Sequence, residues 1–403
     1  MSVLNGKKIL LGVSGGIAAY KTASLVRLFI KAGAHVQVIM TPASKDFVTP
    51  LTLSTLSRKP VFSSFYNEDD QEAEWNNHVE LGLWADLMLV APATANTMSK
   101  MTNGNCDNLL IATYLSAKCP VYVAPAMDLD MYKHPSTIAS FTALQKFGNT
   151  IIPAESGELA SGLSGEGRMA EPENIVAFIE SDLESKLPLK GKKFLITAGP
   201  TYEAIDPVRF IGNHSSGKMG FDIASSAANL GAEVVLVSGP THFKTNHPSI
   251  LLIPVVSAQE MYKACHAHFS QMDVVIAAAA VADYRPKTVA TQKIKKSADN
   301  FVIELEKTKD ILLSLGEIKK NQFLIGFALE TENEIENAKL KIQKKNLDLI
   351  VLNSLQDEGA GFKKATNKVT FIDKDFNIEP MELKPKEEVA DDILNKIKAY
   401  FHD

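Results

Sequence analysis

An apolar segment with the same start occurs twice along the chain, at residues 6–16 and at residues 191–200. Each copy runs from Gly-Lys-Lys through consecutive apolar residues to a turn of small residues. Such a run is typical of a strand that is buried on both faces of a parallel sheet. The repetition predicts two domains that each begin with a buried parallel strand.

Each copy is followed by a helical pattern and then by another apolar strand. The helices are expected at 17–32 and 218–230, and both end at Gly-Ala, where glycine suits a left-handed cap. The strands are expected at 36–40 and 234–237. The order strand, helix, strand predicts an α/β chain of two Rossmann-like domains with mostly parallel sheets.

The domain boundary is expected near residue 188, in a short polar stretch with a proline. With 403 residues the chain exceeds one ordinary core, so we expect domains at 1–188 and 189–403. Further strands are expected at 87–92, 121–125, 274–280, 323–327, 349–353 and 368–372, and a closing helix at 386–400.

Composition excludes several classes of protein. The net charge of −5 gives no sign of nucleic-acid binding, and no apolar run reaches the roughly 18 residues of a membrane span. Three scattered cysteines without a CxxC pair argue against zinc sites and a disulfide framework. The start shows no signal-peptide pattern, so we expect a cytoplasmic protein.

The small-residue turn 12–17 lies between a strand and a helix, where a backbone can approach an anion. The alternative is a tight turn without a ligand. The turn lacks the GxGxxG pattern, and the second strand ends at Met40-Thr41, where NAD sites usually carry an acidic residue. These features weigh against an NAD(P)-linked oxidoreductase, whereas Thr41 suits a phosphate or a flavin.

Two more segments of the first half can carry chemistry. The loop 91–97 follows a strand and suits a ring edge or phosphate, or else Thr94 or Asn96 caps a helix. His78 is a candidate base or carboxylate ligand, although a lone histidine is more often structural.

These segments, together with Pro125-Ala126-Met127, resemble the flavin-containing cysteine decarboxylases in their order. The resemblance implies that FMN oxidises the substrate thiol so that carbon dioxide can leave. It implies His78 as the active-site histidine, donated across a trimer interface. The implied FMN contacts are Ser14, Gly15, Gly16, Thr41, Ala93, Thr94, Asn96 and Thr97.

The chain departs from this family at two positions. Asp128 stands where the family has asparagine, and Ser161 stands where its flap has cysteine. We expect decarboxylation to persist, because a protonated Asp128 can donate both a hydrogen bond and a proton. Arg168 is a candidate cation for a substrate phosphate or carboxylate, with a surface arginine as the alternative.

The second half carries a polar loop, 206–220, whose Asn and Ser residues suit either helix capping or an anion site with Arg209. The alanines 277–280 leave room for a flat ligand at a strand end, and Asp283 suits a metal or ribose. Lys293 lies in a basic run that is either a solvated face or a phosphate site.

This half closely resembles the phosphopantothenate–cysteine ligases from Thr197 to Asn353. The resemblance implies activation by CTP with magnesium, with Asp283 toward the metal and with Arg209 and Asn213 at the acyl-intermediate site. Lys293 would neutralise phosphate charge. The implied nucleotide contacts are Ala277, Ala278, Ala279, Asp283, Lys293, Asp310, Phe327, Lys341 and Lys345.

Both resemblances together match the bifunctional enzymes of coenzyme A biosynthesis. They imply ligation of 4'-phosphopantothenate to L-cysteine, with release of CMP and pyrophosphate, and then decarboxylation to 4'-phosphopantetheine. They also imply a homo-oligomer, with trimers of the first domain and dimers of the second, combined into a dodecamer. The alternative is an active ligase with an impaired or regulatory flavoprotein half.

Overall fold

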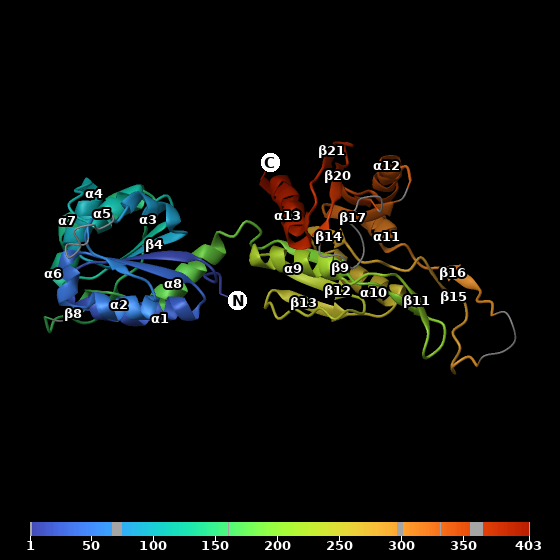
Figure 1. Cartoon of the computed structure of the whole chain (residues 1–403), viewed down its shortest axis with the longest axis horizontal. Helices are drawn as coiled ribbons and strands as arrows, with labels where there is room; N and C mark the ends of the chain where they lie inside the picture. The colour runs from blue at the N-terminus through green and yellow to red at the C-terminus, as the bar shows by residue number, and fades with distance from the viewer. Residues whose placement is uncertain are drawn as a thin grey trace. The chain divides into compact units, whose positions relative to one another are not determined.

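The chain forms two compact units, Met1–Ser185 and Lys186–Asp403, in the computed structural model (Figure 1). The structure describes residues 2–66, 75–159, 161–295, 301–330, 332–354 and 366–402. Leu189 is buried in the core of the second unit, and its N–H donates to Leu230 O at 2.9 Å. The two units divide between Ser185 and Lys186.

The first unit is built on a six-stranded parallel sheet with the order β3-β2-β1-β4-β5-β6. The order reverses between β1 and β4, which places a ligand crevice at their carboxyl ends. The strands are β1 Lys8–Val13, β2 His35–Met40, β3 Val61–Phe62, β4 Leu87–Ala93, β5 Val121–Pro125 and β6 Thr150–Ile151.

Helices cover both faces of this sheet (Figure 1). Apolar side chains of α1, α2 and α8 pack in one core, and those of α4, α5 and α7 pack in the other. The helices are η1 Ile17–Lys21, α1 Thr22–Lys31, η2 Pro42–Asp46, α2 Pro50–Ser57, α3 His78–Trp84, α4 Ala95–Asn103, α5 Leu109–Ser116, α6 Leu129–Lys133, α7 Pro135–Lys146 and α8 Pro172–Ser185.

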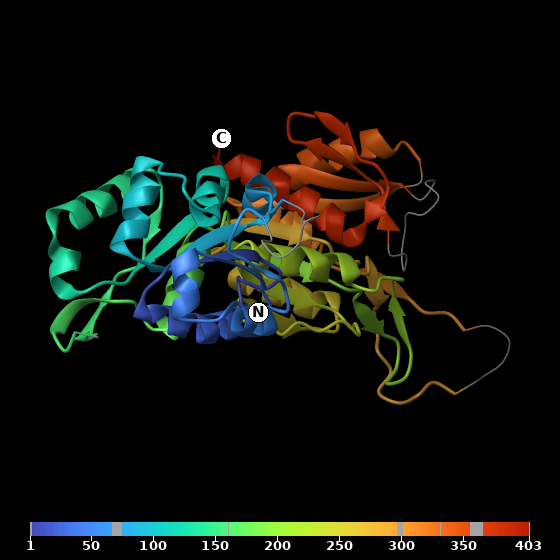
Figure 2. The same cartoon turned by 60° about the vertical axis from the view of Figure 1, so that its left-hand side comes forward.

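The predicted helix 17–32 begins differently from the expectation. Its first turn is a 3-10 helix in which Ala19 N–H donates to Gly16 O, and regular α-helix begins only at Thr22. The predicted glycine caps are confirmed, because Gly33 and Gly231 have φ of +88° and +98°. A separate antiparallel hairpin, β7 Glu155–Glu158 with β8 Ser164–Arg168, is visible in green in Figure 2.

The second unit is built on an eight-stranded sheet with the order β13-β12-β9-β14-β17-β18-β20-β21. The first six strands are parallel, and β20 and β21 continue antiparallel. The strands are β9 Lys193–Ala198, β12 Glu233–Ser238, β13 Ile250–Pro254, β14 Val274–Ala277, β17 Phe323–Glu330, β18 Leu349–Ser354, β20 Val369–Asp373 and β21 Ile378–Pro380.

Helices again form two layers, with α9 and α13 in one core and α10, α11 and α12 in the other. Their bounds are α9 Lys218–Asn229, α10 Ala258–Phe269, α11 Ile311–Ile318, α12 Glu334–Lys345 and α13 Lys386–His402. Three small two-stranded antiparallel sheets pair β10 Tyr202–Ala204 with β11 Phe210–Gly212, β15 Tyr284–Pro286 with β16 Leu305–Lys307, and β19 Thr366–Asn367 with β22 Lys384–Pro385.

The predicted strand 274–280 is too long. Strand β14 ends at Ala277, because the next alanines bond to a side chain of β9 and to the loop after it instead of continuing the ladder. Ala279 N–H donates to Thr197 Oγ1 at 3.1 Å, and Ala280 N–H donates to Gly199 O at 2.9 Å.

Within the described residues, we find no helix with the length and apolarity that a membrane crossing requires.

Candidate functional site

A cavity of about 930 Å³ opens at the carboxyl ends of β1 and β4 in the first unit. Its volume lies in the range of cofactor and small-molecule sites. It is lined by Gly15, Gly16, Ile17, Ala18, Tyr20, Lys21, Thr41, Pro42, Ala43, Thr94, Ala95, Asn96, Thr97, Lys100, Asp107, Asn108, Ala126, Met127, Asp128, Met131, Glu158, Leu159, Gly167, Arg168 and Met169.

The glycine turn brings backbone close to this cavity. A Cβ at Gly15 would lie 2.8 Å from Ala43 Cβ, so only glycine fits between the turn and the loop after β2. Ser14 is fully buried, and its hydroxyl donates to Pro92 O at 2.6 Å and accepts from Thr94 N–H at 3.1 Å. Ser14 therefore joins the two loops behind the cavity wall.

The loop after β4 forms another part of the wall. Thr94 caps α4 by accepting from Thr97 N–H at 3.3 Å, so the capping interpretation is confirmed for this residue. Thr94, Asn96 and Thr97 nevertheless line the cavity, whereas Ala93 is buried behind them. Capping and ligand binding are compatible here, because the N-terminus of α4 faces the cavity.

Thr41 carries the most direct sign of a ligand site. Val13 and Met40 pair in register, so Thr41 leaves the sheet beside the glycine turn. Its Oγ1 is buried without a hydrogen-bond partner among the described residues, and it lines the cavity. A buried hydroxyl without a partner is costly, so a bound polar group such as that of a flavin nucleotide fits this position.

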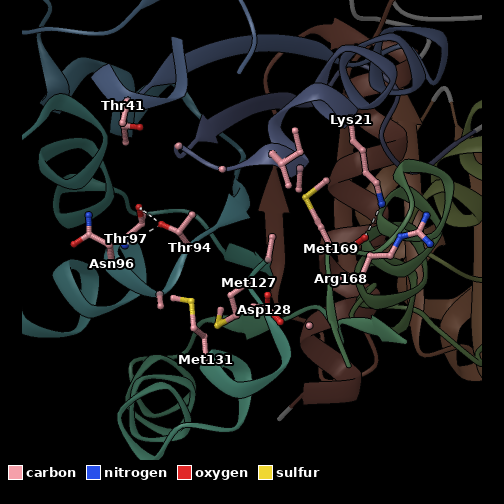
Figure 3. A pocket seen from close by; sticks show the side chains of 18 of the residues that line it. Lys21, Thr41, Thr94, Asn96, Thr97, Met127, Asp128, Met131, Arg168 and Met169 are labelled. Carbon is pink, nitrogen blue, oxygen red and sulfur yellow. Dashed lines mark hydrogen bonds between the residues drawn. The ribbon is translucent and has the colours of Figure 1, made fainter. Parts of the chain in front are cut away.

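The side of the cavity opposite Thr41 carries charge (Figure 3). Asp128 caps α6, with Oδ1 accepting from Leu129 N–H at 2.6 Å. Arg168 ends the hairpin strand β8, which is tied to the same loop by Met127 N–H donating to Gly167 O at 3.0 Å. The structure thus brings Asp128 and Arg168 to one cavity, as the sequence predicts for two site residues.

Ser161 and His78 also lie outside the cavity lining, as Ser14 and Ala93 do. Ser161 is exposed between β7 and β8, and its Oγ accepts from Leu163 N–H at 3.4 Å. His78 begins α3 and lies edge-on to Phe65, with ring centroids 6.1 Å apart, and near Trp75. Its buried Nδ1 has no partner among the described residues.

In the second unit, polar loops meet at the carboxyl ends of β9 and β14. Ala277 pairs with both Thr197 and Gly326, so Ala278, Ala279 and Phe327 follow at one edge of the sheet. The nucleotide contacts expected at these positions are therefore neighbours. Asn213 reaches the same edge, because its Nδ2 donates to Ala280 O and Val281 O at 3.2 and 3.0 Å.

The capping interpretation is wrong for Asn213. Helix α9 has Gly217 as its cap residue, without a side-chain cap, so Asn213 serves the β14 loop instead. Lys218 forms ion pairs within the fold, since its Nζ lies 2.8 Å from Asp222 and 3.0 Å from Glu387.

A buried carboxylate that sequence reasoning missed, Asp206, organises the next loop. It accepts from the backbone N–H groups of Val208 and Arg209, both at 2.8 Å, and pairs with the Arg209 guanidinium. It also accepts from Ile294 N–H at 3.1 Å, while Arg209 NH2 donates to Ile294 O at 2.7 Å. The segment that carries exposed Lys293 is therefore held by Asp206 and Arg209.

The charge state of Asp206 follows from these contacts. Burial raises its pKa, but the hydrogen bonds from Arg209 and from three backbone N–H groups outweigh burial and lower the pKa below its ordinary value. Asp206 therefore stays ionised at neutral pH, and Arg209 keeps a fixed counter-charge.

The remaining predicted nucleotide residues form two ion pairs. Asp310 caps α11 and pairs with Lys345 at 2.8 Å, and Lys341 pairs with Glu330 at the end of β17. Asp283 is exposed, and the described residues contain no cluster of three or more His, Cys, Asp or Glu side chains that could hold a metal. A metal at Asp283 would need ligands from a bound phosphate.

Comparison with known proteins gives matches over both units. Residues 2–184 match a family described as flavoprotein, and residues 189–401 match the DNA/pantothenate metabolism flavoprotein C-terminal domain. The coenzyme A biosynthesis bifunctional protein CoaBC of Bacillus subtilis is 45% identical over 399 residues, covering 98% of both chains. The protein of the same name from Escherichia coli is 42% identical, covering 99% of this chain and 98% of its own.

One further relative carries a different name. A cysteine/cysteine sulfinic acid decarboxylase of an unknown prokaryotic organism is 53% identical over 360 residues, covering 88% of this chain and all of its own.

Proposed function

The chain belongs to the family of bifunctional coenzyme A biosynthesis proteins, and from this membership we propose which residues of each unit carry the chemistry. It is an enzyme that joins a phosphopantothenate–cysteine ligase to an FMN-dependent phosphopantothenoylcysteine decarboxylase. The assignment of roles rests above all on the cavity beside β1 and β4, with its unpartnered Thr41 hydroxyl.

In the first unit, FMN supplies the two-electron chemistry that makes carbon dioxide a good leaving group. The glycine turn and the residues Thr41, Thr94 and Thr97 would hold the flavin through backbone and hydroxyl groups. Asp128 would contact the reacting end of the substrate, and Arg168 would bind one of its anionic groups. His78 lies outside the cavity lining of its own chain, which supports our proposal that a second copy supplies it across a trimer interface.

In the second unit, the carboxylate of 4'-phosphopantothenate would attack the α-phosphate of CTP, and pyrophosphate would leave. The cysteine amine would then attack the acyl carbonyl and displace CMP. Lys293 would neutralise phosphate charge as it develops. The Asn213 side-chain nitrogen already holds the β14 loop, so its amide oxygen would orient the incoming amine.

We propose magnesium as the metal partner of CTP. Magnesium usually keeps several waters and is held by one or two carboxylates together with substrate phosphates. Asp283, exposed in the segment between β14 and β15, suits that role. We also propose dimers of the second unit, a dodecameric assembly and a cytoplasmic location. The three free cysteines agree with a reducing compartment.

A single assay tests both activities. Purified protein is given 4'-phosphopantothenate, cysteine and CTP, and pyrophosphate and carbon dioxide are followed together. We expect both products, and chelation of magnesium should stop pyrophosphate release first. Cysteine alone serves as a second arm because one relative is named a cysteine decarboxylase. Carbon dioxide from cysteine without CTP would favour that second function.

The two departures from the family pattern lead to a linked prediction. We expect the unaltered enzyme to complete decarboxylation, because Asp128 lies in the cavity while Ser161 lies outside its lining. Asp128→Asn should reduce turnover several-fold, since a general acid contributes strongly to proton transfer. Adding Ser161→Cys should partly restore it, and the measurements are carbon dioxide release and 4'-phosphopantetheine formation.

The matched control for this experiment is Asp130→Asn, because Asp130 is an exposed neighbour outside the cavity lining. It should leave turnover unchanged. An Asp128→Asn enzyme that is faster than the unaltered enzyme would show that the aspartate hinders the reaction.

A further inference from the structure

Two cationic side chains of the first unit share one carboxylate at the wall of the cavity. Lys21 Nζ donates to Glu171 Oε1 at 3.0 Å, and Arg168 NH2 pairs with the same oxygen. Lys21 and Arg168 both line the cavity, and Figure 3 places them on the same side. Lys21, Arg168 and Glu171 together therefore carry one net positive charge.

The two ion pairs differ in burial. The Lys21 side chain is only 5% exposed, and its Nζ also donates to Met169 O at 2.9 Å. The Arg168 side chain is 41% exposed. A buried charge that loses its partner is strongly unfavourable, whereas an exposed pair contributes little. The Lys21–Glu171 pair is therefore the permanent one, and the Arg168–Glu171 pair can open.

Glu171 keeps its negative charge in this arrangement. Burial raises its pKa, but the hydrogen bonds and charges of Lys21 and Arg168 outweigh burial and lower the pKa below its ordinary value. Glu171 is further held from behind, since its N–H donates to Glu155 Oε1 at 3.2 Å on the hairpin strand β7. The carboxylate is thus fixed in place between its two cations.

We propose that Lys21 and Glu171 are positioning residues whose fixed ion pair presents Arg168 to an anionic group of the decarboxylase substrate. When that anion enters, Arg168 exchanges Glu171 for it, and Lys21 continues to neutralise Glu171. This inference rests on the proposed function of the cavity. Lys21 governs anion affinity without touching the anion.

The charge balance gives the inference a distinctive signature. In Lys21→Met, Glu171 has Arg168 as its only cation in this group, so the net positive charge of the group is lost. Arg168 then stays paired with Glu171 and is not available to the substrate anion. In Lys21→Met with Glu171→Gln, both charges disappear together and Arg168 is free again. The double variant should therefore bind substrate better than the single variant. A purely structural role of Lys21 would give the opposite order.

The test measures KM and kcat for decarboxylation of 4'-phosphopantothenoylcysteine by the FMN-loaded full chain. Lys21→Met should raise KM about tenfold, the size of one lost charge-assisted hydrogen bond, with little change in kcat. The double variant should return KM to within about twofold of the unaltered value. In an Arg168→Met background, adding Lys21→Met should change KM no further.

Matched controls are Glu173→Gln and Lys31→Met, because both residues are exposed, lie outside the cavity lining and carry the same charges. Flavin absorbance gives the FMN content of every variant. Loss of FMN from Lys21→Met would overturn the inference by showing that the lysine holds the cofactor. An unchanged KM, or a double variant worse than Lys21→Met alone, would overturn it too.

A binding arm identifies the anion. 4'-Phosphopantetheine carries the phosphate but no carboxylate, and its affinity is measured by titrating the flavin absorbance. Weaker binding to Lys21→Met would assign Arg168 to the phosphate, and unchanged binding beside a raised substrate KM would assign it to the carboxylate. If the unaltered protein binds neither compound, the proposed function itself fails, which is distinct from a failure of the ion-pair exchange alone.

Discussion

Replacing Lys293 by alanine or glutamine should reduce pyrophosphate release by about 100-fold or more. That is the size of the effect when a group that stabilises charge in the transition state is lost. The side chain is exposed, but the backbone at the next residue is held at both its N–H and its C=O by Asp206 and Arg209. A fixed backbone beside an exposed ammonium group suits the binding of a triphosphate.

Lys295→Ala is the matched control, because Lys295 is an exposed lysine two positions further along the same segment. It should retain most of the activity if position, and not general positive charge, decides the effect. Pyrophosphate is measured with CTP and 4'-phosphopantothenate present and cysteine absent. A Lys293 variant with nearly normal release would remove this lysine from the mechanism.

His78→Asn should abolish carbon dioxide release while pyrophosphate release stays intact. Loss of a general acid or base costs about 10²–10⁴-fold in rate. The buried Nδ1 of His78 lacks a hydrogen-bond partner among the described residues, which is unfavourable for a histidine with only a structural role. Since the histidine lies in the first unit and ligation belongs to the second, the two activities should separate.

The control is His35→Asn, because His35 is an exposed histidine at the start of β2 in the same unit. The native mass of each variant is measured as well, since the proposal places His78 at an interface between copies. Equal loss of both activities, or a change of mass with loss of activity, would assign His78 to folding or assembly.

The sequence predicts the fold well because its signals are local. The apolar strands and the helix-ending glycines Gly33 and Gly231 follow from neighbouring residues. The cavity wall at Gly15, Gly16 and Thr41 is predictable for the same reason, since two adjacent parallel strands end there. The predicted strand 274–280 is longer than β14, because Ala279 and Ala280 bond to β9 and to the loop after it instead of continuing the ladder.

The residues that were missed have partners far away in the sequence. Lys21 meets Glu171 across 150 residues, and Asp206 meets Ile294 across 88. The sequence around Lys21 and around Asp206 looks like that of a surface residue. Only the fold reveals that both side chains are buried. Asn213 shows the converse, since its local pattern suggested a cap and its true contacts lie 67 and 68 positions away.

The contacts of Asp206 also determine how freely this part of the chain can vary. Asp206 and Arg209 hydrogen-bond to Ile294 through its main-chain N–H and C=O, so its side chain takes no part in these bonds. Other residue types at position 294 can therefore keep these two hydrogen bonds. Proline is the exception, because it has no N–H. Position 206 has no such freedom, since its carboxylate satisfies several donors at once.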